Sequence, residues 1–237
     1  MFVTVPVPSR VAALVLVLVL GAACGGAASP SPSATVVTVA PTASPAATAV
    51  PSAPQANAIT WTVDASSKAT IRVREQLVRL PSPIDALITI TGAQGGFTLN
   101  PDGTFAPNSK LSVDMTTITT DDRQRTDSIR RDPLEVTRFR TSELVPKTTT
   151  GLTLPLPSAG EFTFKLIGDL TLHGVTKSVS FDVRATRADG KLTATATANP
   201  SWKFGDFGMQ PPTSFSVLSI VDEIRLEFAL VANEART

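Results

Sequence analysis

The feature that most constrains this chain is an alternation of apolar and polar residues that begins near Ile59 and continues through Leu230. A period of two is typical of strands with one buried face, because successive side chains of a strand point to opposite faces. Turn signals separate the alternating segments, at Gly95–Gly96, Asn100–Gly103, His173–Gly174 and Ala188–Gly190. The apolar positions are Ile71 and Val73; Leu111, Val113 and Met115; Phe162, Phe164 and Leu166; Val179, Phe181 and Val183; alternate residues of Leu192–Ala198; and Ile224, Leu226, Phe228 and Leu230. The sequence therefore predicts an all-β domain, an antiparallel sandwich or barrel.

One charged segment, residues 119–132 (TTDDRQRTDSIRRD), interrupts this pattern. Thr120 is expected to cap a short helix whose first turn carries two aspartates, at the positive end of the helix dipole. Pro133 is expected to end the helix. Ion pairs at a spacing of four would support it, namely Asp121–Arg125 and Asp127–Arg131. The segment is either a solvated surface helix or a lid over one end of a barrel.

The N-terminal residues 1–23 have the layout of a signal peptide. Arg10 precedes ten apolar residues, Val11–Leu20, a length typical of a signal-peptide core and too short to span a bilayer. The small residues before Cys24 resemble a lipobox, at which a signal peptidase cuts before a cysteine that becomes lipidated. The alternative is a conventional secretory signal followed by an incidental cysteine.

The next segment, residues 24–57, is rich in Ala, Pro, Ser and Thr and contains no charged residue. Such a composition cannot bury enough apolar surface to offset its ordering entropy, so we expect a disordered linker. The globular domain is expected to occupy residues 58–237. We therefore expect an exported protein, anchored to the cell membrane through Cys24 and facing the periplasm or the cell exterior.

The composition also excludes several kinds of chemistry. Cys24 is the only cysteine and His173 the only histidine, so neither a disulfide nor a zinc site of the usual ligands is expected. His173 lies in a predicted turn, where a structural role is favoured over catalysis. We expect no cofactor and no enzyme activity. A formal net charge of +1 gives no reason to expect a nucleic-acid partner. The sequence does not indicate the oligomeric state.

One run, Gly168–Val183 (GDLTLHGVTKSVSFDV), resembles the central strand–turn–strand of the YceI-like family, described as lipid- or polyisoprenoid-binding. The resemblance extends over Ile59–Ala232 through weaker segments that occur in the same order as in the family. These are Trp61–Asp64, Ser112–Asp132, Asp206–Met209 with Pro211–Pro212, and Leu226–Ala232.

The resemblance implies a lipocalin-like antiparallel barrel of about eight strands, with one short inserted helix and a long apolar cavity. It also implies a ligand that is an isoprenoid or a fatty amphiphile. The chain departs from the family at two places that often carry histidine, near Ser66–Ser67 and at Arg72–Glu75. The groups that would hold a ligand's polar head therefore differ here.

Apolar, mostly aromatic residues at inward positions are the candidate ligand-binding residues. Each of them either lines a ligand cavity or fills the core. They are Phe105, Phe139, Phe162, Phe164, Leu166, Phe181, Phe207, Phe215, Leu226 and Phe228. The first hypothesis is a tethered binding protein that holds a lipid for transport, storage or sequestration. The alternative is a cell-envelope interaction module with a packed barrel, whose loops bind a protein or a glycan.

Overall fold

The computed structural model describes residues 54–235. They form strands joined by short turns, with one α-helix, α1 (Arg123–Arg131), and two 3₁₀ turns, Met115–Thr117 and Phe204–Phe207. The strands are β1 (Ile59–Val63), β2 (Lys68–Leu77), β3 (Ile84–Ile90), β4 (Gln94–Leu99), β5 (Lys110–Asp114), β6 (Thr119–Thr120), β7 (Thr141–Thr150), β8 (Gly160–Leu172), β9 (Val175–Ala188), β10 (Lys191–Ala198) and β11 (Val217–Glu234). Within residues 54–235, no helix is both long enough and apolar enough to cross a membrane.

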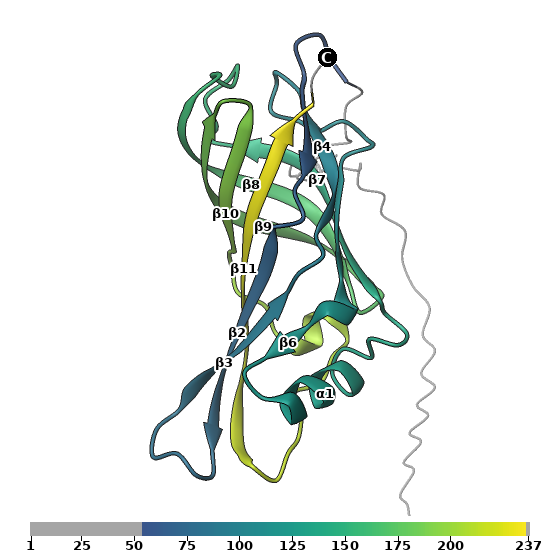
Figure 1. The fold of residues 1–237 in the computed structure, drawn as a ribbon, viewed down its shortest axis with the longest axis vertical. Helices are drawn as coiled ribbons and strands as arrows, with labels where there is room; N and C mark the ends of the chain where they lie inside the picture. The colour runs from purple at the N-terminus through teal and green to yellow at the C-terminus, as the bar shows by residue number, and fades with distance from the viewer. Residues whose placement is uncertain (1–53, 236–237) are drawn as a thin grey trace, which may run out of the picture. The chain divides into compact units, whose positions relative to one another are not determined.

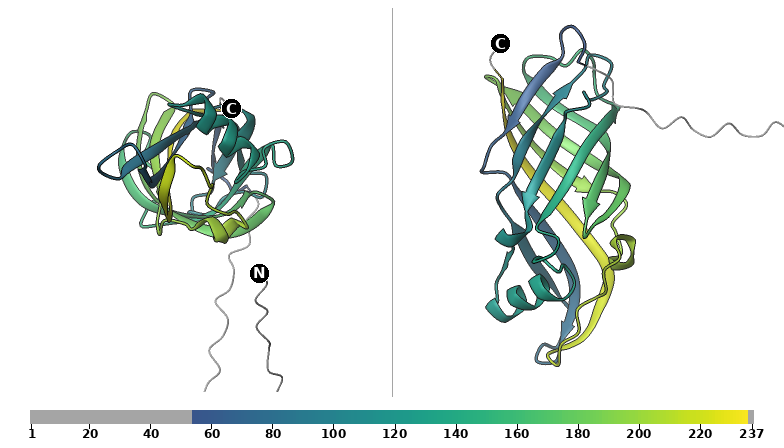
Figure 2. Two further views of the ribbon diagram at one scale, coloured as in Figure 1. Left: turned by 90° about the horizontal axis from the view of Figure 1, so that it is seen from below. Right: turned by 90° about the vertical axis from the view of Figure 1, so that its right-hand side faces the viewer.

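Eight strands form a closed ring in the order β1-β4-β5-β7-β8-β9-β10-β11. The ring closes where β11 pairs with β1, with Val63 opposite Ala232. Figure 1 shows the barrel from the side, and the left view in Figure 2 looks into it from below. The pairings in the ring are antiparallel, and closure leaves no free edge within the ring itself. The predicted antiparallel barrel of about eight strands is confirmed.

The remaining strands continue the barrel below this ring. The long strand β11 pairs antiparallel with both β1 and β2, so these two are consecutive parts of one broken strand. Strands β3 and β4 also form one broken strand, because β3 pairs with β2 and β4 pairs with β1. Strands β5 and β6 form another, because β5 pairs with β4 and β6 pairs with β3. Three neighbouring strands of the barrel are therefore interrupted at a similar level.

A hydroxyl side chain bridges two of these interruptions. The buried Ser67 hydroxyl donates to the carbonyl oxygen of Val231 at 3.0 Å and accepts from the Val231 N–H at 2.9 Å. Thr117 makes the same pair of bonds with Thr91, at 2.8 Å to its carbonyl oxygen and 3.0 Å from its N–H. In both places the side chain accepts from a backbone N–H that the interrupted strand would otherwise leave unpaired. The carbonyl oxygen of Val231 also accepts from the N–H of Asp64 at 2.8 Å.

The alternating segments lie in strands as expected, and most of the predicted turns are present. His173–Gly174 and Asp189–Gly190 have positive φ at both residues, which is typical of two-residue hairpins. The turn expected at Gly95–Gly96 is wrong, because both glycines lie inside β4. A Cβ on Gly96 would lie 2.6 Å from the carbonyl oxygen of Trp61, so glycine is needed there for close approach of two strands rather than for a turn.

The predicted helix is present, but its cap differs from the expectation. Asp122, and not Thr120, is the N-cap, because its carboxylate accepts from the N–H of Arg125 at 2.8 Å. Thr120 lies in β6, and its hydroxyl instead donates to the carbonyl oxygen of Asp122. The helix ends before Pro133, as predicted. Asp121 pairs with Arg125 as expected, whereas the ion-pair partner of Arg131 is Asp132 and not Asp127.

Several predictions lie outside the described residues. They are the signal peptide of residues 1–23, the lipidation of Cys24 and all of the linker 24–57 except its last four residues. These remain predictions.

Candidate functional site

The barrel encloses a cavity of about 770 Å³. Its wall is built by the inward rows of the strands, such as Phe162, Phe164 and Leu166 on β8 and Leu226 and Phe228 on β11. These side chains are apolar and point inward, yet they are only partly buried. Side chains that meet across a packed core would be fully buried, so this part of the barrel is hollow.

Seven of the ten candidate ligand-binding residues line the cavity. They are Phe105, Phe162, Phe164, Leu166, Phe181, Leu226 and Phe228. They come from strands β8, β9 and β11 and from the loop after β4. The alternation pattern therefore correctly predicted inward-facing residues in segments that are far apart in the sequence. Their contact with a ligand remains a prediction.

The other three candidates, Phe139, Phe207 and Phe215, are not on the cavity wall. Phe207 is buried behind it, with its ring 5.3 Å from that of Trp202. Phe139 packs outside the wall against the His173 ring at 4.3 Å. The side chain of Phe215 is fully exposed on the loop before β11. None of the three lies on a paired strand, so strand alternation does not determine their direction.

One end of the barrel is closed by aromatic rings and one arginine. Trp61 stacks on Phe97 at 5.3 Å between ring centroids, and Phe97 meets Phe105 edge-on at 6.1 Å. Arg187 lies over the Trp61 ring and pairs with Glu234 at 2.7 Å. Its guanidinium also donates to the carbonyl oxygen of Pro157 at 2.9 Å. Protein groups therefore bind both terminal nitrogens of this buried guanidinium, whereas its Nε has no hydrogen-bond partner among the described residues. Arg187 is not part of the cavity wall.

The opposite end is open. Six residues of the cavity wall are exposed to solvent, and all of them lie at this end: Arg79, Asp121, Asp122, Gln124, Ser214 and Ser216. They come from the β2–β3 hairpin, from the start of α1 and from the loop before β11 (Figure 1). Because Gln124, Arg125, Ser128 and Ile129 of α1 also line the cavity, the helix covers part of the opening, which agrees with the lid hypothesis for this segment.

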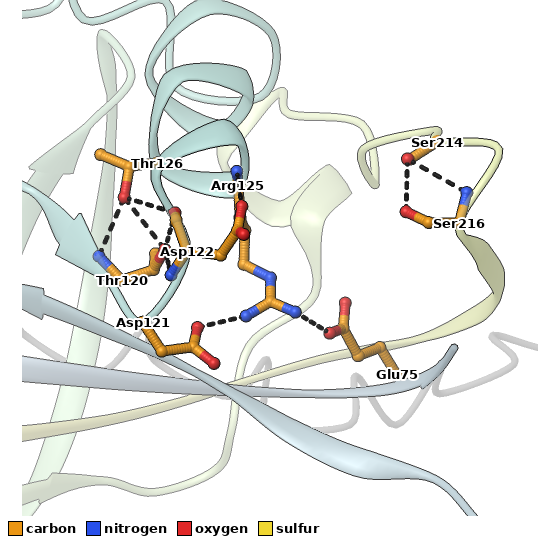
Figure 3. Close-up of polar contacts among 8 residues, drawn as sticks. All are labelled: Glu75, Thr120, Asp121, Asp122, Arg125, Thr126, Ser214 and Ser216. Carbon is orange, nitrogen blue, oxygen red and sulfur yellow. Dashed lines mark hydrogen bonds and ion pairs between the residues drawn. The ribbon is translucent and has the colours of Figure 1, made fainter. Parts of the chain in front are cut away.

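A buried carboxylate faces the cavity just inside this opening. Glu75 lies on the inward row of β2, and its side chain is only 7% exposed. Arg125 of α1 donates to Glu75 Oε1 at 2.8 Å through Nη2 and pairs with Asp121 through Nη1 (Figure 3). Burial raises the pKa of the Glu75 carboxyl above its ordinary value, and the charge of Arg125 offsets only part of that effect.

The sequence reasoning missed Glu75, although a signal for it was present. Ile71 and Val73 were placed on the inward face, and continuing the same alternation by two residues reaches Glu75. Its partner Arg125 comes from a segment fifty residues later, which no local pattern indicates.

Together these features suit an amphiphilic molecule. The apolar wall offers no hydrogen bonds and accepts a hydrocarbon chain, whereas the Glu75–Arg125 pair offers hydrogen bonds at the open end. Among the described residues, no group of three His, Cys, Asp or Glu side chains is arranged to hold a metal ion. His173 lies in the β8–β9 turn, where it contacts Glu135 and the carbonyl oxygen of Phe207 at 2.8 and 3.2 Å, as expected for a structural turn residue.

Comparison with known proteins places this architecture. A model of the YceI-like domain matches residues 47–232. The structure is similar to that of a polyisoprenoid binding domain from Saccharophagus degradans implicated in plant cell wall breakdown, with 12% identity and a TM-score of 0.55, covering 74% of this chain and 98% of that one. It is also similar to BcnA from Burkholderia cenocepacia, with 18% identity and a TM-score of 0.53, covering 72% and 99%. No curated protein matches the sequence.

Proposed function

This chain belongs to the YceI-like domain family, and from that membership we propose that it binds one isoprenoid-type lipid or another long-chain amphiphile inside its barrel. The observation that carries the proposal is the hollow, apolar cavity of about 770 Å³, which opens at one end beside a buried ion pair. A packed barrel, on which the alternative of a loop-binding interaction module depended, does not agree with this cavity.

The energetics favour a long apolar chain. Burying about 500 Å² of hydrocarbon would contribute roughly 12 kcal/mol before costs, at about 25 cal/mol per Å². Loss of ligand freedom offsets much of this. A polar ligand would bury groups that find no hydrogen-bond partner on this wall, and this costs binding free energy. A ligand that is apolar along most of its length avoids that cost.

The polarity of the cavity also sets the direction of the ligand. We propose that the tail extends toward Trp61 and Phe97, and that the polar head lies near Glu75 and Arg125. Among the described residues, none is hydrogen-bonded to the second carboxylate oxygen of Glu75, so this oxygen is available to a hydroxyl or amide on the ligand. A strongly anionic head is disfavoured here because the cavity wall at this end carries three carboxylates, Glu75, Asp121 and Asp122, against the two cations Arg79 and Arg125.

The cellular setting is part of the proposal and rests on the sequence. We propose that the chain is exported and held at a membrane through Cys24, with the linker 24–57 as a spacer, so that the barrel works near a lipid source. The proposed role is binding for transport, storage or sequestration, and it requires no catalytic step.

The decisive experiment is identification of the bound molecule. Protein purified from exporting cells is extracted with organic solvent, and the extract is analysed by mass spectrometry. We expect one class of amphiphile in roughly stoichiometric amount, and added isoprenoid quinone should raise the melting temperature of delipidated protein. An empty barrel whose melting temperature ignores such lipids would overturn the proposal.

A further inference from the structure

The open end of the barrel carries a group of exposed apolar side chains. We call Val78, Leu80, Phe215 and Leu218 the apolar tip; they include the most exposed large apolar side chains of residues 54–235. Val78 and Leu80 begin the β2–β3 connection, and Phe215 and Leu218 flank the start of β11. The two segments are adjacent, because the N–H of Val78 donates to the carbonyl oxygen of Ser216 at 3.0 Å and Leu77 pairs with Val217. They lie together at the lower end of the barrel (Figures 1 and 2).

The apolar tip borders the opening of the cavity. Along each segment, residues that line the cavity alternate with residues of the tip: Leu77 and Arg79 line it, whereas Val78 and Leu80 are exposed. On the other segment Ser214, Ser216 and Val217 line the cavity, whereas Phe215 and Leu218 are exposed. The apolar tip therefore lies on the outer face of the same two segments whose inner face borders the opening.

The charge around the tip excludes several partners. Residues 207–221 contain no charged side chain, and residues 76–84 contain only Arg79. Pro81 and Pro83 in the hairpin and Pro211 and Pro212 in the loop have no N–H group, which lowers the cost of moving this backbone out of water. These two segments thus lack the basic cluster that binds anionic lipids.

We propose that the apolar tip inserts into the interface of a zwitterionic lipid bilayer and so places the open end of the cavity against the lipid. Exposed aliphatic and aromatic side chains on loops gain free energy when they enter the headgroup boundary. The use of this insertion, delivery of a lipid to the cavity, rests on the proposed function, whereas insertion itself needs no ligand. An anchor at Cys24 is compatible with the same bilayer, because the twenty-nine residues between Cys24 and Pro54 can span at most roughly 100 Å.

The test places a fluorescent probe at the tip of the full chain. In a Cys24→Ala background, Phe215→Cys gives a unique thiol for a bimane label, and Leu87→Cys, an exposed apolar position on β3 away from the tip, is the matched control. Vesicles of phosphatidylcholine carry a spin-labelled quencher in their acyl chains. We expect a blue shift and at least twofold quenching at position 215, little change at position 87, and no requirement for anionic lipid or low salt.

A second variant separates insertion from ligand binding. Phe215→Ser combined with Leu218→Ser should slow transfer of an isoprenoid quinone from vesicles to the barrel at least fivefold, with equal affinity in detergent solution. If the barrel binds no lipid but the probe is still quenched, the proposed function fails and the insertion stands. The inference is overturned if position 215 stays in water, if positions 87 and 215 respond equally, or if the probe is buried only in concentration-dependent dimers.

Discussion

Each end of the barrel buries one charged side chain, and the two ends stabilise that charge in different ways. Each has a charged residue on an otherwise apolar inward row, Arg187 on β9 and Glu75 on β2. Arg187 is 7% exposed and has a carboxylate, carbonyl oxygens and an aromatic ring as partners. Glu75 is equally buried but has only Arg125, and it faces the cavity. The two charges are far apart along the barrel. Glu75 is paired with Ile220 of β11, the carboxylate partner of Arg187 is Glu234 of the same strand, and these two positions on β11 are on the order of 40 Å apart.

The comparison shows that burial alone does not distinguish a structural charge from one available to a ligand. Both charges carry a desolvation cost. At the closed end Glu234, backbone carbonyl oxygens and the Trp61 ring offset this cost at the terminal nitrogens of Arg187, and the charge helps to close the barrel. At the open end one carboxylate oxygen is left without a protein partner, so a ligand can supply the missing interaction. The following experiments test this difference.

The largest effect is expected at the closed end. Arg187→Met removes the buried cation together with its hydrogen bonds to Glu234 and to the carbonyl oxygen of Pro157, which should cost about 3 kcal/mol in total. For a domain of this size, that corresponds to a loss of roughly 6–12 °C in melting temperature, measured by calorimetry. Arg184→Met, on the outward face of the same strand, is the control and should change the melting temperature by about 1 °C or less. Equal effects of the two variants would contradict the sealing role.

Filling the space between the ends should abolish most binding without unfolding the barrel. Ala196 points inward from β10 and lines the cavity, so Ala196→Phe places a ring where the ligand tail is proposed to lie. Affinity for an isoprenoid quinone should fall at least tenfold, which is about 1.4 kcal/mol. The measurement is titration by intrinsic tryptophan fluorescence. Thr195→Phe points outward and should leave the affinity unchanged; a loss in both variants would point to a nonspecific effect.

Removing the cation at the open end should cost less than at the closed end. Arg125→Met leaves Glu75 facing a cavity that opens to solvent, where the carboxyl can be hydrated or take a proton. We expect a stability loss of about 1 kcal/mol in urea unfolding, against about 3 kcal/mol for Arg187→Met. Arg123→Met on the exposed start of α1 is the control. A loss as large as that of Arg187→Met would show that the two ends do not differ.

The smallest effect depends on pH. Because the pKa of folded Glu75 is raised above its ordinary value of 4.5, the folded protein binds this proton more tightly than the unfolded chain does. Its contribution to stability is therefore fully present below pH 4.5 and is lost as the pH rises through the folded pKa. Glu75→Gln, which does not titrate, should become more stable relative to the parent protein across this interval, by on the order of 1 °C in melting temperature at neutral pH. The exposed Glu161→Gln should show no such trend.

Much of the fold was predictable because strand alternation is a local property. The rows Phe162–Leu166 and Val179–Val183 fix which side chains face inward, wherever the strands finally pair. Continuing the row Ile71–Val73 by two residues reaches Glu75, and continuing the row Val179–Val183 by four residues reaches Arg187. Their presence was therefore predictable, but their roles were not, because the roles depend on partners that come from distant segments.

Other features depend on contacts that no local pattern contains. Gly95–Gly96 has the composition of a turn, but the approach of β1 requires glycine within a strand. Phe215 is of a residue type that is usually buried, but it lies on a loop. The burial of a loop residue depends on contacts with other segments, and here Phe215 is exposed. The joining of β1 and β2 into one broken strand depends on β11, which lies at the other end of the domain sequence.

The hydroxyl bridges at Ser67 and Thr117 have a mechanical consequence for the barrel. A hydrogen bond made by a side chain involves rotatable side-chain bonds that a backbone-to-backbone hydrogen bond between strands does not have. Such a bond can therefore be kept when the direction of the strand changes. The bridges lie between the ring that contains Trp61 and the lower part that contains Glu75 and α1. We therefore expect bending to be easiest at the level of Ser67 and Thr117, so that the opening would change its width while the closed end keeps its shape.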